Sequence, residues 1–274
     1  MKKIIAILAV ALMAVPAFAK GSFEVRDFGS FKLHVYNSGD VMTDASFIVE
    51  SENGIVKMEV PLFKADSAQF EDYAAALGKK TIAVIGDYHL GNQDNMILPE
   101  GMNAFSRGPV YGGMMEGFKK SFGDSMIDLP LGSGAEILFG KKQYIDGVSY
   151  EFHHGPANDF PDADILIGGK VLLGHWAPVK AHLGSLQLSS SEAVDQLIDA
   201  SQAELRTGAR LFLGGHNGVG KRSDLRFKLR YLKTVKKLLA AESSAEGFAS
   251  ALKAAYPGLA GEDGVAALSE ALYK

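Results

Sequence analysis

Three of the seven histidines occupy the same kind of position in the sequence, just after an apolar run. They are His89, His175 and His216. A neutral imidazole is a common metal ligand, and nearby glycines let the backbone come close to a bound ion or substrate. A single histidine at such a position is more often structural, but three of them favour a shared site. The apolar runs are residues 81–85, 171–173 and 211–213.

The stretch GDYHLGN, residues 86–92, adds an acidic side chain to this set. Asp87, His89, His175 and His216 could together supply one site with two or three imidazoles and one carboxylate. Such a set suits zinc or iron. Asp87 would be either a ligand or the base that orients a water molecule. The chain has no cysteine, which excludes thiolate ligands and a cysteine nucleophile.

The composition is that of an ordinary globular protein. The 274 residues are 47% hydrophobic and 22% charged, with a formal net charge of −4. This charge gives no indication of nucleic-acid binding, and a small-molecule ligand or substrate is a possible partner. No linker or low-complexity run divides the chain, which favours a single domain over residues 20–274.

The first 19 residues have the pattern of a secretory signal peptide. Lys2 and Lys3 precede an apolar core, and an A-x-A cleavage site follows at residues 17–19. Cleavage after Ala19 would give a mature chain that starts at Lys20 in the periplasm or outside the cell. No later stretch reaches the ~18 apolar residues that a membrane span needs, so the mature chain is expected to have none.

The elements that must position these residues alternate between strands and helices. Asp66, with Gln69 three positions later, predicts the start of a helix that stops at Gly78. This helix lies between two predicted strands, which indicates a β-α-β unit. Residues 91–135 are expected to form a long loop with one short helix at 113–122. The remaining predictions are strands at 31–36, 45–50, 55–60, 81–85, 135–139, 147–153, 164–173 (with a Gly168-Gly169 hairpin turn) and 209–213, a helix from the serine cluster 189–191 to Arg206, and a helical C-terminal region.

This order of elements and histidine loops resembles the metallo-β-lactamase fold, the αβ/βα sandwich of zinc- and iron-dependent hydrolases. That family carries H-x-H-x-D-H after a strand, then a loop like G-P-A-H-T, a strand ending in G-D and a strand ending in G-H. The stretches that resemble these motifs are AVIGDYHLGN, HHGPAND, GGKVLLGHW and ARLFLGGHNGVG. The resemblance covers nearly the whole mature length, and it implies an α+β fold with two mixed sheets flanked by helices.

Position by position, the resemblance implies that most of the family's ligands have changed. His89 and His216 keep two of its histidines. Asp87 stands where the first histidine would be, and His175 stands where the bridging aspartate would be. The other family positions are held by Gly91 (aspartate), Asn92 (the adjacent histidine) and Asn158 (the third first-site histidine).

The loss of carboxylates argues against a second metal ion, so at most one ion, zinc or iron, is expected. A slip of the alignment by one residue would bring His153 or His154 nearer, and only one of two neighbours on a strand can face the site. The expected pocket residues are Asn92, Asn158, Trp176 and His154. We expect Asp87, His89, Asn158, His175 and His216 to converge at one end of the sandwich.

Two functions fit this degenerate ligand set. The ligand count favours a non-catalytic descendant that keeps the fold to bind a small molecule or a protein. The alternative is a mononuclear zinc- or iron-dependent hydrolase that acts on an ester or amide bond.

Overall fold

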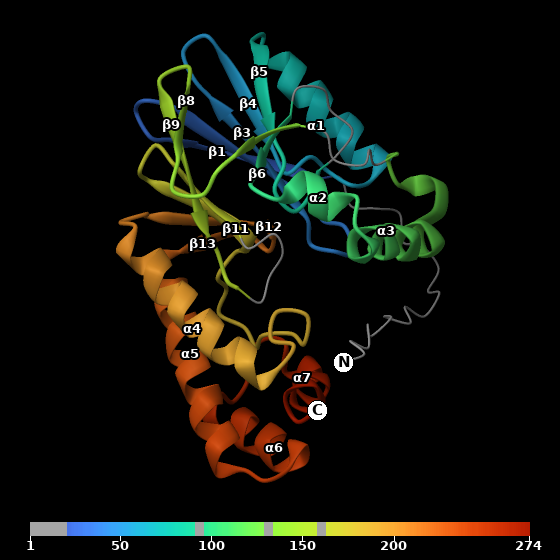
Figure 1. Cartoon of the computed structure of the whole chain (residues 1–274), viewed down its shortest axis with the longest axis vertical. Helices are drawn as coiled ribbons and strands as arrows, with labels where there is room; N and C mark the ends of the chain where they lie inside the picture. Colours follow the sequence, from blue (N-terminus) through green and yellow to red (C-terminus); the bar gives the residue numbers. More distant parts are fainter. Residues whose placement is uncertain (1–20, 91–95, 129–133, 158–162) are drawn as a thin grey trace.

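Two β-sheets pack face to face in the computed structural model, which describes residues 21–90, 96–128, 134–157 and 163–274 (Figure 1). The first sheet follows the chain order. Strands β1 to β4 are antiparallel, and β4 to β7 are parallel. Its strands are β1 (Ser22–Asp27), β2 (Lys32–Asn37), β3 (Ala45–Glu50), β4 (Gly54–Met58), β5 (Lys80–Ile85), β6 (Met96–Pro99) and β7 (Gly134–Ile137).

The second sheet has the order β13-β12-β11-β10-β9-β8. Only β11 and β12 pair in parallel among its described strands, because a helix connects them; the other neighbours are antiparallel. Its strands are β8 (Lys142–Ile145), β9 (Val148–His154), β10 (Ala163–Ile167), β11 (Val171–Trp176), β12 (Leu211–His216) and β13 (Gly218–Lys221).

The main hydrophobic core lies between the two sheets. Alternate residues of each strand point to the same face, so one face of each sheet supplies large apolar side chains to this layer. Burial of such side chains stabilises the fold by roughly 1.5–3 kcal/mol each. Fully buried members of the core include Leu33, Phe47, Met58, Tyr150, Phe152 and Ile165.

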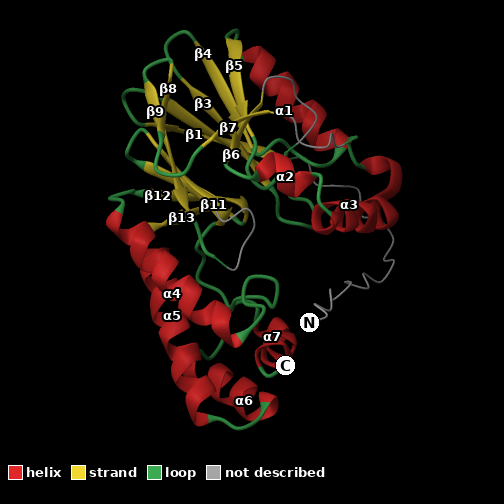
Figure 2. Ribbon diagram, viewed as in Figure 1, coloured by secondary structure: helices red, strands yellow, loops and turns green. Residues whose placement is uncertain are grey.

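Helices cover the outer faces of both sheets, as Figure 2 shows. Phe70 and Ala74 of α1 (Lys64–Ala76) pack on the outer face of the first sheet beside Tyr36 and Ile48. Leu225 of α5 (Arg222–Ala241) packs on the outer face of the second sheet, and α4 (Ser191–Arg206) lies alongside α5. The predicted αβ/βα sandwich is therefore confirmed.

The C-terminal helices form a second apolar cluster away from the sandwich. In Figure 1, α6 (Ala245–Ala255) and α7 (Val265–Leu272) lie at the far end of α4 and α5. Phe248, Leu252 and Leu268 are fully buried there against Tyr231 and Leu232 of α5. None of the helices in the described residues is long and apolar enough to cross a membrane.

Two β-α-β crossovers determine which strand ends, and therefore which loops, lie together at one edge of each sheet. The predicted β-α-β unit is present as β4, α1 and β5, and β11, α4 and β12 form a second one. Because parallel strands end at the same edge of a sheet, the loops after β4 and β5 lie together, as do the ends of β11 and β12.

Some local predictions were wrong. Helix α1 begins at Lys64, so Asp66 is not its N-cap; the Asp66 carboxylate is buried and accepts a hydrogen bond from the Tyr36 hydroxyl (2.7 Å).

The N-cap of α4 is Ser190, whose hydroxyl accepts a hydrogen bond from the backbone N–H of Ala193. The predicted loop at 91–135 contains β6, α2 (Met102–Ser106), α3 (Pro109–Phe122) and the start of β7. The short strands β8 and β13 were not predicted.

Candidate metal centre

A buried carboxylate, Glu59, fixes the loop that carries His89. Glu59 follows β4 and is fully buried. Its Oε1 accepts the backbone N–H of Asp87 (2.8 Å), and its Oε2 accepts the backbone N–H of His89 (3.0 Å). Burial raises the pKa of Glu59 to about 7, and these backbone hydrogen bonds oppose the shift. Glu59, at the end of the parallel strand β4, thus fixes the backbone of the loop after the neighbouring strand β5.

Gly215 lets this loop press against the second sheet. A Cβ atom at Gly215 would lie 3.0 Å from Oε2 of Glu59 and 3.2 Å from Cε1 of His89. Both contacts are tighter than side chains normally tolerate, so the glycine next to His216 is what allows the His89 ring to approach β12.

His216 is the last residue of β12, and it meets an acid from the other sheet. A single antiparallel bridge pairs it with Asp44, in the loop that precedes β3. Nδ1 of His216 lies 2.9 Å from Oδ1 of Asp44 and 3.1 Å from the carbonyl oxygen of Met42. The backbone N–H of Asn217 donates to the carbonyl of Thr43 (3.1 Å), which ties the same two segments together.

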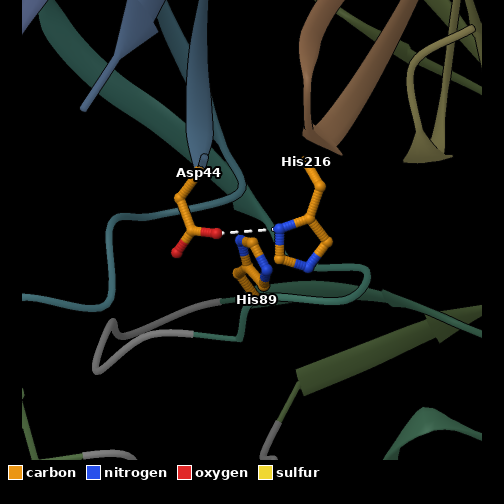
Figure 3. Close-up of side chains that lie close together, drawn as sticks. All are labelled: Asp44, His89 and His216. Atoms are coloured by element: carbon orange, nitrogen blue, oxygen red, sulfur yellow. Dashed lines mark ion pairs between the residues drawn. The ribbon is translucent and has the colours of Figure 1, made fainter. Parts of the chain in front are cut away.

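Asp44, His89 and His216 form one cluster, shown in Figure 3. Each offers a ligand atom, and these atoms lie within 4.8 Å of one another. All three residues are buried, with exposed fractions of 3%, 7% and 7%. Nδ1 of His89 has no hydrogen-bond partner among the described residues and lies 3.8 Å from Oε2 of Glu59. A buried imidazole nitrogen without a partner is costly, and a metal ion would satisfy it.

The donor set fits a divalent ion such as zinc or iron. Two imidazoles and one carboxylate are found at catalytic zinc sites and at non-haem iron sites. Ligand atoms at about 2.0–2.2 Å from an ion are at most ~4.4 Å apart. Ligand atoms within 4.8 Å of one another are close to this limit, so the cluster has about the size that one ion requires.

The charge states of the three residues are set by burial and by one another. Burial lowers the pKa of His89 to about 4, with Asp44 acting in the opposite direction, so His89 is neutral near pH 7. Burial would raise the pKa of Asp44, but the nearby His89 and the hydrogen bond from His216 outweigh it and hold that pKa below its usual value. Burial lowers the pKa of His216, but Asp44, the Met42 carbonyl and Glu59 together raise it by more, so the net shift is upward.

His175 and Trp176 lie beside this cluster without belonging to it. The His175 ring stacks on Tyr88 with centroids 3.9 Å apart, and it lies 5.1 Å from the His216 ring. The Trp176 ring lies 4.4 Å from the His216 ring and lines a second cavity, between the second sheet and the helices α4 and α5. The structure thus brings the rings of His89, His175 and His216 close together, and the predicted role of His175 as a ligand stays a prediction.

The other predicted residues lie elsewhere or outside the described part. The Asp87 side chain is fully buried and is not a member of the three-residue cluster, so its role as ligand or base stays a prediction. His154, at the end of β9, is exposed and packs on Phe139, with ring centroids 4.0 Å apart. Asn92 and Asn158 lie outside the described residues.

Sequence reasoning missed Asp44 and Glu59. Glu59 had a usable signal, because it follows an apolar strand just as Asp87 does. Asp44 had none of this kind, since it lies in an ordinary polar loop before a strand and joins the site only through contact between the two sheets.

A cavity opens over the histidines, with about 510 Å³ of space when open solvent is included. Its floor is histidine and tyrosine, and its other walls are apolar. The residues that line it are Met42, Leu62, Tyr88, His89, Met102, Phe105, Tyr111, Met114, Met115, Phe118, His175 and His216.

Comparison with known proteins gives matches among solved structures. No family model matches the sequence, and no curated protein matches it. A double mutant of the sec-alkyl sulfatase PisA1 has a TM-score of 0.62 at 14% identity, over 90% of this chain and 49% of that one. A metallo-beta-lactamase family protein from Thermus thermophilus has a TM-score of 0.55 at 14% identity, over 92% and 90%. The DIM-1 metallo-beta-lactamase has 0.52 at 11% identity, over 80% and 99%. At these identities the likeness concerns the fold.

Proposed function

We propose that this chain, which has the metallo-β-lactamase fold, holds one divalent metal ion through Asp44, His89 and His216 and hydrolyses an ester or amide bond. The observation that supports the proposal is the buried three-residue cluster, of which His89 and His216 line the cavity. A bound zinc or iron ion would supply Lewis acidity for polarising a carbonyl group and for promoting the ionisation of water.

The chain's own residues provide the setting for this chemistry. His89 is neutral near pH 7 and so is ready to coordinate, whereas Asp44 favours the protonated form of His216, which cannot coordinate a metal. Glu59 holds the backbone of the His89 loop, and Asp44 supplies negative charge beside both imidazoles. The apolar walls exclude water around the scissile bond, which strengthens electrostatic interactions there.

Metal content and hydrolysis test this function directly. Protein purified without chelators should contain one zinc or iron ion per chain, or take up one on titration. The loaded protein should hydrolyse p-nitrophenyl esters, whereas His89→Ala should lose both the ion and the activity. His153→Ala is the matched control, because His153 is a half-exposed histidine on β9 away from the cluster. A protein that takes up no ion even with added zinc would contradict the proposal.

A non-catalytic ligand-binding protein is the second candidate. The direct contact between Asp44 and His216 favours it, because this ion pair partly offsets the burial of both charges without an ion. In that case the metal-free protein should bind its ligand as tightly as protein incubated with zinc.

We also propose that the protein is exported. The basis is the signal-peptide pattern of residues 1–19, which places the proposed metal site in the periplasm or outside the cell.

A further inference from the structure

One helix supplies much of the apolar wall of the cavity over the histidines. Tyr111, Met114, Met115 and Phe118 of α3 all line it. These positions recur at the spacing of one helix face. The opposite face of α3 is polar and includes Glu116 and the two lysines 119 and 120. Helix α3 therefore lies as an amphipathic cover over the site.

The same helix contains three glycines that its packing does not require. A Cβ atom at Gly112, Gly113 or Gly117 would meet no atom within 4 Å, and none of the three has a positive φ. Glycine in a helix interior is less favourable than alanine by roughly 0.8–1 kcal/mol per residue. These glycines thus weaken α3 without serving a close contact or a turn.

The apolar wall indicates what the cavity accepts. Four of its residues are methionines, whose unbranched side chains adapt to different shapes. None of the wall residues from α2 and α3 carries a charge. A charged group placed against them would lose its hydration without gaining a partner. Among the described lining residues, polar groups come from His89, His175 and His216 and from the hydroxyls of Tyr88 and Tyr111.

We propose that α3 is a movable cover that opens to admit the alkyl or aryl part of a substrate, whose ester or amide group then lies at the histidine floor. The weakened helix supports the movement, and the methionine and aromatic wall supports the apolar ligand. This inference rests on the proposed function for the reacting group, but the cavity and its cover are tested without metal.

The apolar dye N-phenyl-1-naphthylamine is the probe for the cavity. Its fluorescence should rise on binding the metal-free protein. Met115→Lys should weaken binding by at least about tenfold, because the ammonium group would be desolvated in the cavity. Val110→Lys is the matched control on the same helix, since Val110 is exposed and does not line the cavity; it should change the affinity by less than about twofold. Equal affinity in wild type and Met115→Lys would overturn the apolar site.

Stopped-flow kinetics of the same dye test the movement. Replacing Gly112, Gly113 and Gly117 together by alanine should strengthen α3 and slow both association and dissociation by between about ten- and fifty-fold, with little change in affinity. Gly264→Ala, at the start of α7, should leave both rates unchanged. Wild-type rates in the triple variant, with helical content retained, would show that α3 does not move to admit the dye.

The substrate class has its own measurement. Zinc-loaded protein should hydrolyse p-nitrophenyl octanoate with a higher kcat/KM than p-nitrophenyl acetate. Preference for the acetate would contradict the inference. Dye binding with no hydrolysis of either ester would support the apolar cavity and its cover α3 but refute the proposed hydrolysis. Failure of this inference can therefore be distinguished from failure of the proposed function.

Discussion

The carboxylate of Asp44 lies 2.9 Å from Nδ1 of His216 and joins the loop before β3 of the first sheet to the end of β12 of the second. Both side chains are buried, and each favours the charged form of the other. The pair is therefore an electrostatic link between the sheets as well as part of the candidate metal centre.

Replacing Asp44 by asparagine should lower the pKa of His216. Without the carboxylate, burial becomes the main influence, and burial favours the neutral ring. The shift can be followed by NMR titration of the His216 ring in metal-free protein. An unchanged pKa would mean that Asp44 and His216 do not interact in solution.

The same variant should lose stability in a defined pH window. His216 has a raised pKa in the folded state, so its contribution is present below the unfolded pKa of about 6.5 and is lost as pH rises through the folded pKa. The pKa of Asp44 is lowered, so its contribution is lost at acid pH. Breaking the pair at pH 5.5 should cost roughly 3–5 kcal/mol of unfolding free energy and less at pH 9, as measured by urea denaturation.

Metal titration of single variants should identify the ligands. His89→Ala, His216→Ala and Asp44→Asn should each abolish tight binding of one zinc ion, because the structure clusters these three side chains. His175→Ala should retain it. Loss of binding in His175→Ala or Asp87→Asn, with binding kept in Asp44→Asn, would restore the ligand set predicted from the sequence. Two ions per chain would refute both sets.

Metal affinity should fall with decreasing pH, and the fall should follow the protonation of His216 and not that of His89. Only the neutral ring coordinates a metal. Because the pKa of His89 is lowered to about 4, this ring stays neutral and able to coordinate down to acid pH. The pKa of His216 is raised above its ordinary value, so this ring becomes protonated first as pH falls. Calorimetric titrations from pH 5 to 9 should show proton release on ion binding at pH 6, and this release should diminish as pH rises through the pKa of His216. Release of no proton at pH 6 would contradict the raised pKa of His216.

Removal of the Glu59 side chain should loosen the His89 loop. Glu59→Ala leaves the buried backbone N–H groups of Asp87 and His89 without their acceptor, at a cost of about 1–3 kcal/mol for each. Glu52→Ala, in an exposed loop, is the control and should change stability by less than about 0.5 kcal/mol. Thermal unfolding and zinc affinity are the two measurements, and both should decline for Glu59→Ala.

The pH dependence of this variant follows from the raised pKa of Glu59, about 7 in the folded protein. A carboxyl group whose pKa is raised on folding stabilises the folded state at pH values below its pKa in the unfolded chain, about 4.5. This contribution is lost as pH rises towards 7. The destabilisation caused by Glu59→Ala should therefore be larger at pH 5 than at pH 8. A larger loss at pH 8 would mean that the Glu59 pKa is not raised.

The signal-peptide prediction concerns residues that the structure does not describe. Mass spectrometry of the native protein should give a chain that begins at Lys20, in the periplasmic or extracellular fraction. A chain that still carries residues 1–19 would refute it.

The long, strongly patterned elements could be predicted from the sequence, and the short ones could not. The sequence of β2 alternates between polar and apolar residues, β3 is an apolar run, and α5 carries an apolar stripe over 20 residues. Strand β6 has four residues and ends in Pro99, which is too short for a periodic signal. The glycines of α3 also lower its helical signal, which is why its first turn was not predicted.

The histidines of the site could be predicted because they follow strands, but the carboxylate could not. Sequence reasoning looked for the acid near the histidine loop, at Asp87. The structure instead brings Asp44 to the cluster through the packing of one sheet on the other. No local pattern encodes which loop of one sheet reaches the edge of the other.

The wide sequence separation of Asp44, His89 and His216 also has a consequence for how the protein reaches its native state. Contacts between distant segments form late, since they require the closure of long loops. The three side chains can meet only after β12 has joined the second sheet and the two sheets have docked. On this order of events, a metal ion is not expected to template the folding of this chain. Any ion that the site takes up would therefore be selected by a scaffold that has already folded, and its release should leave that scaffold folded.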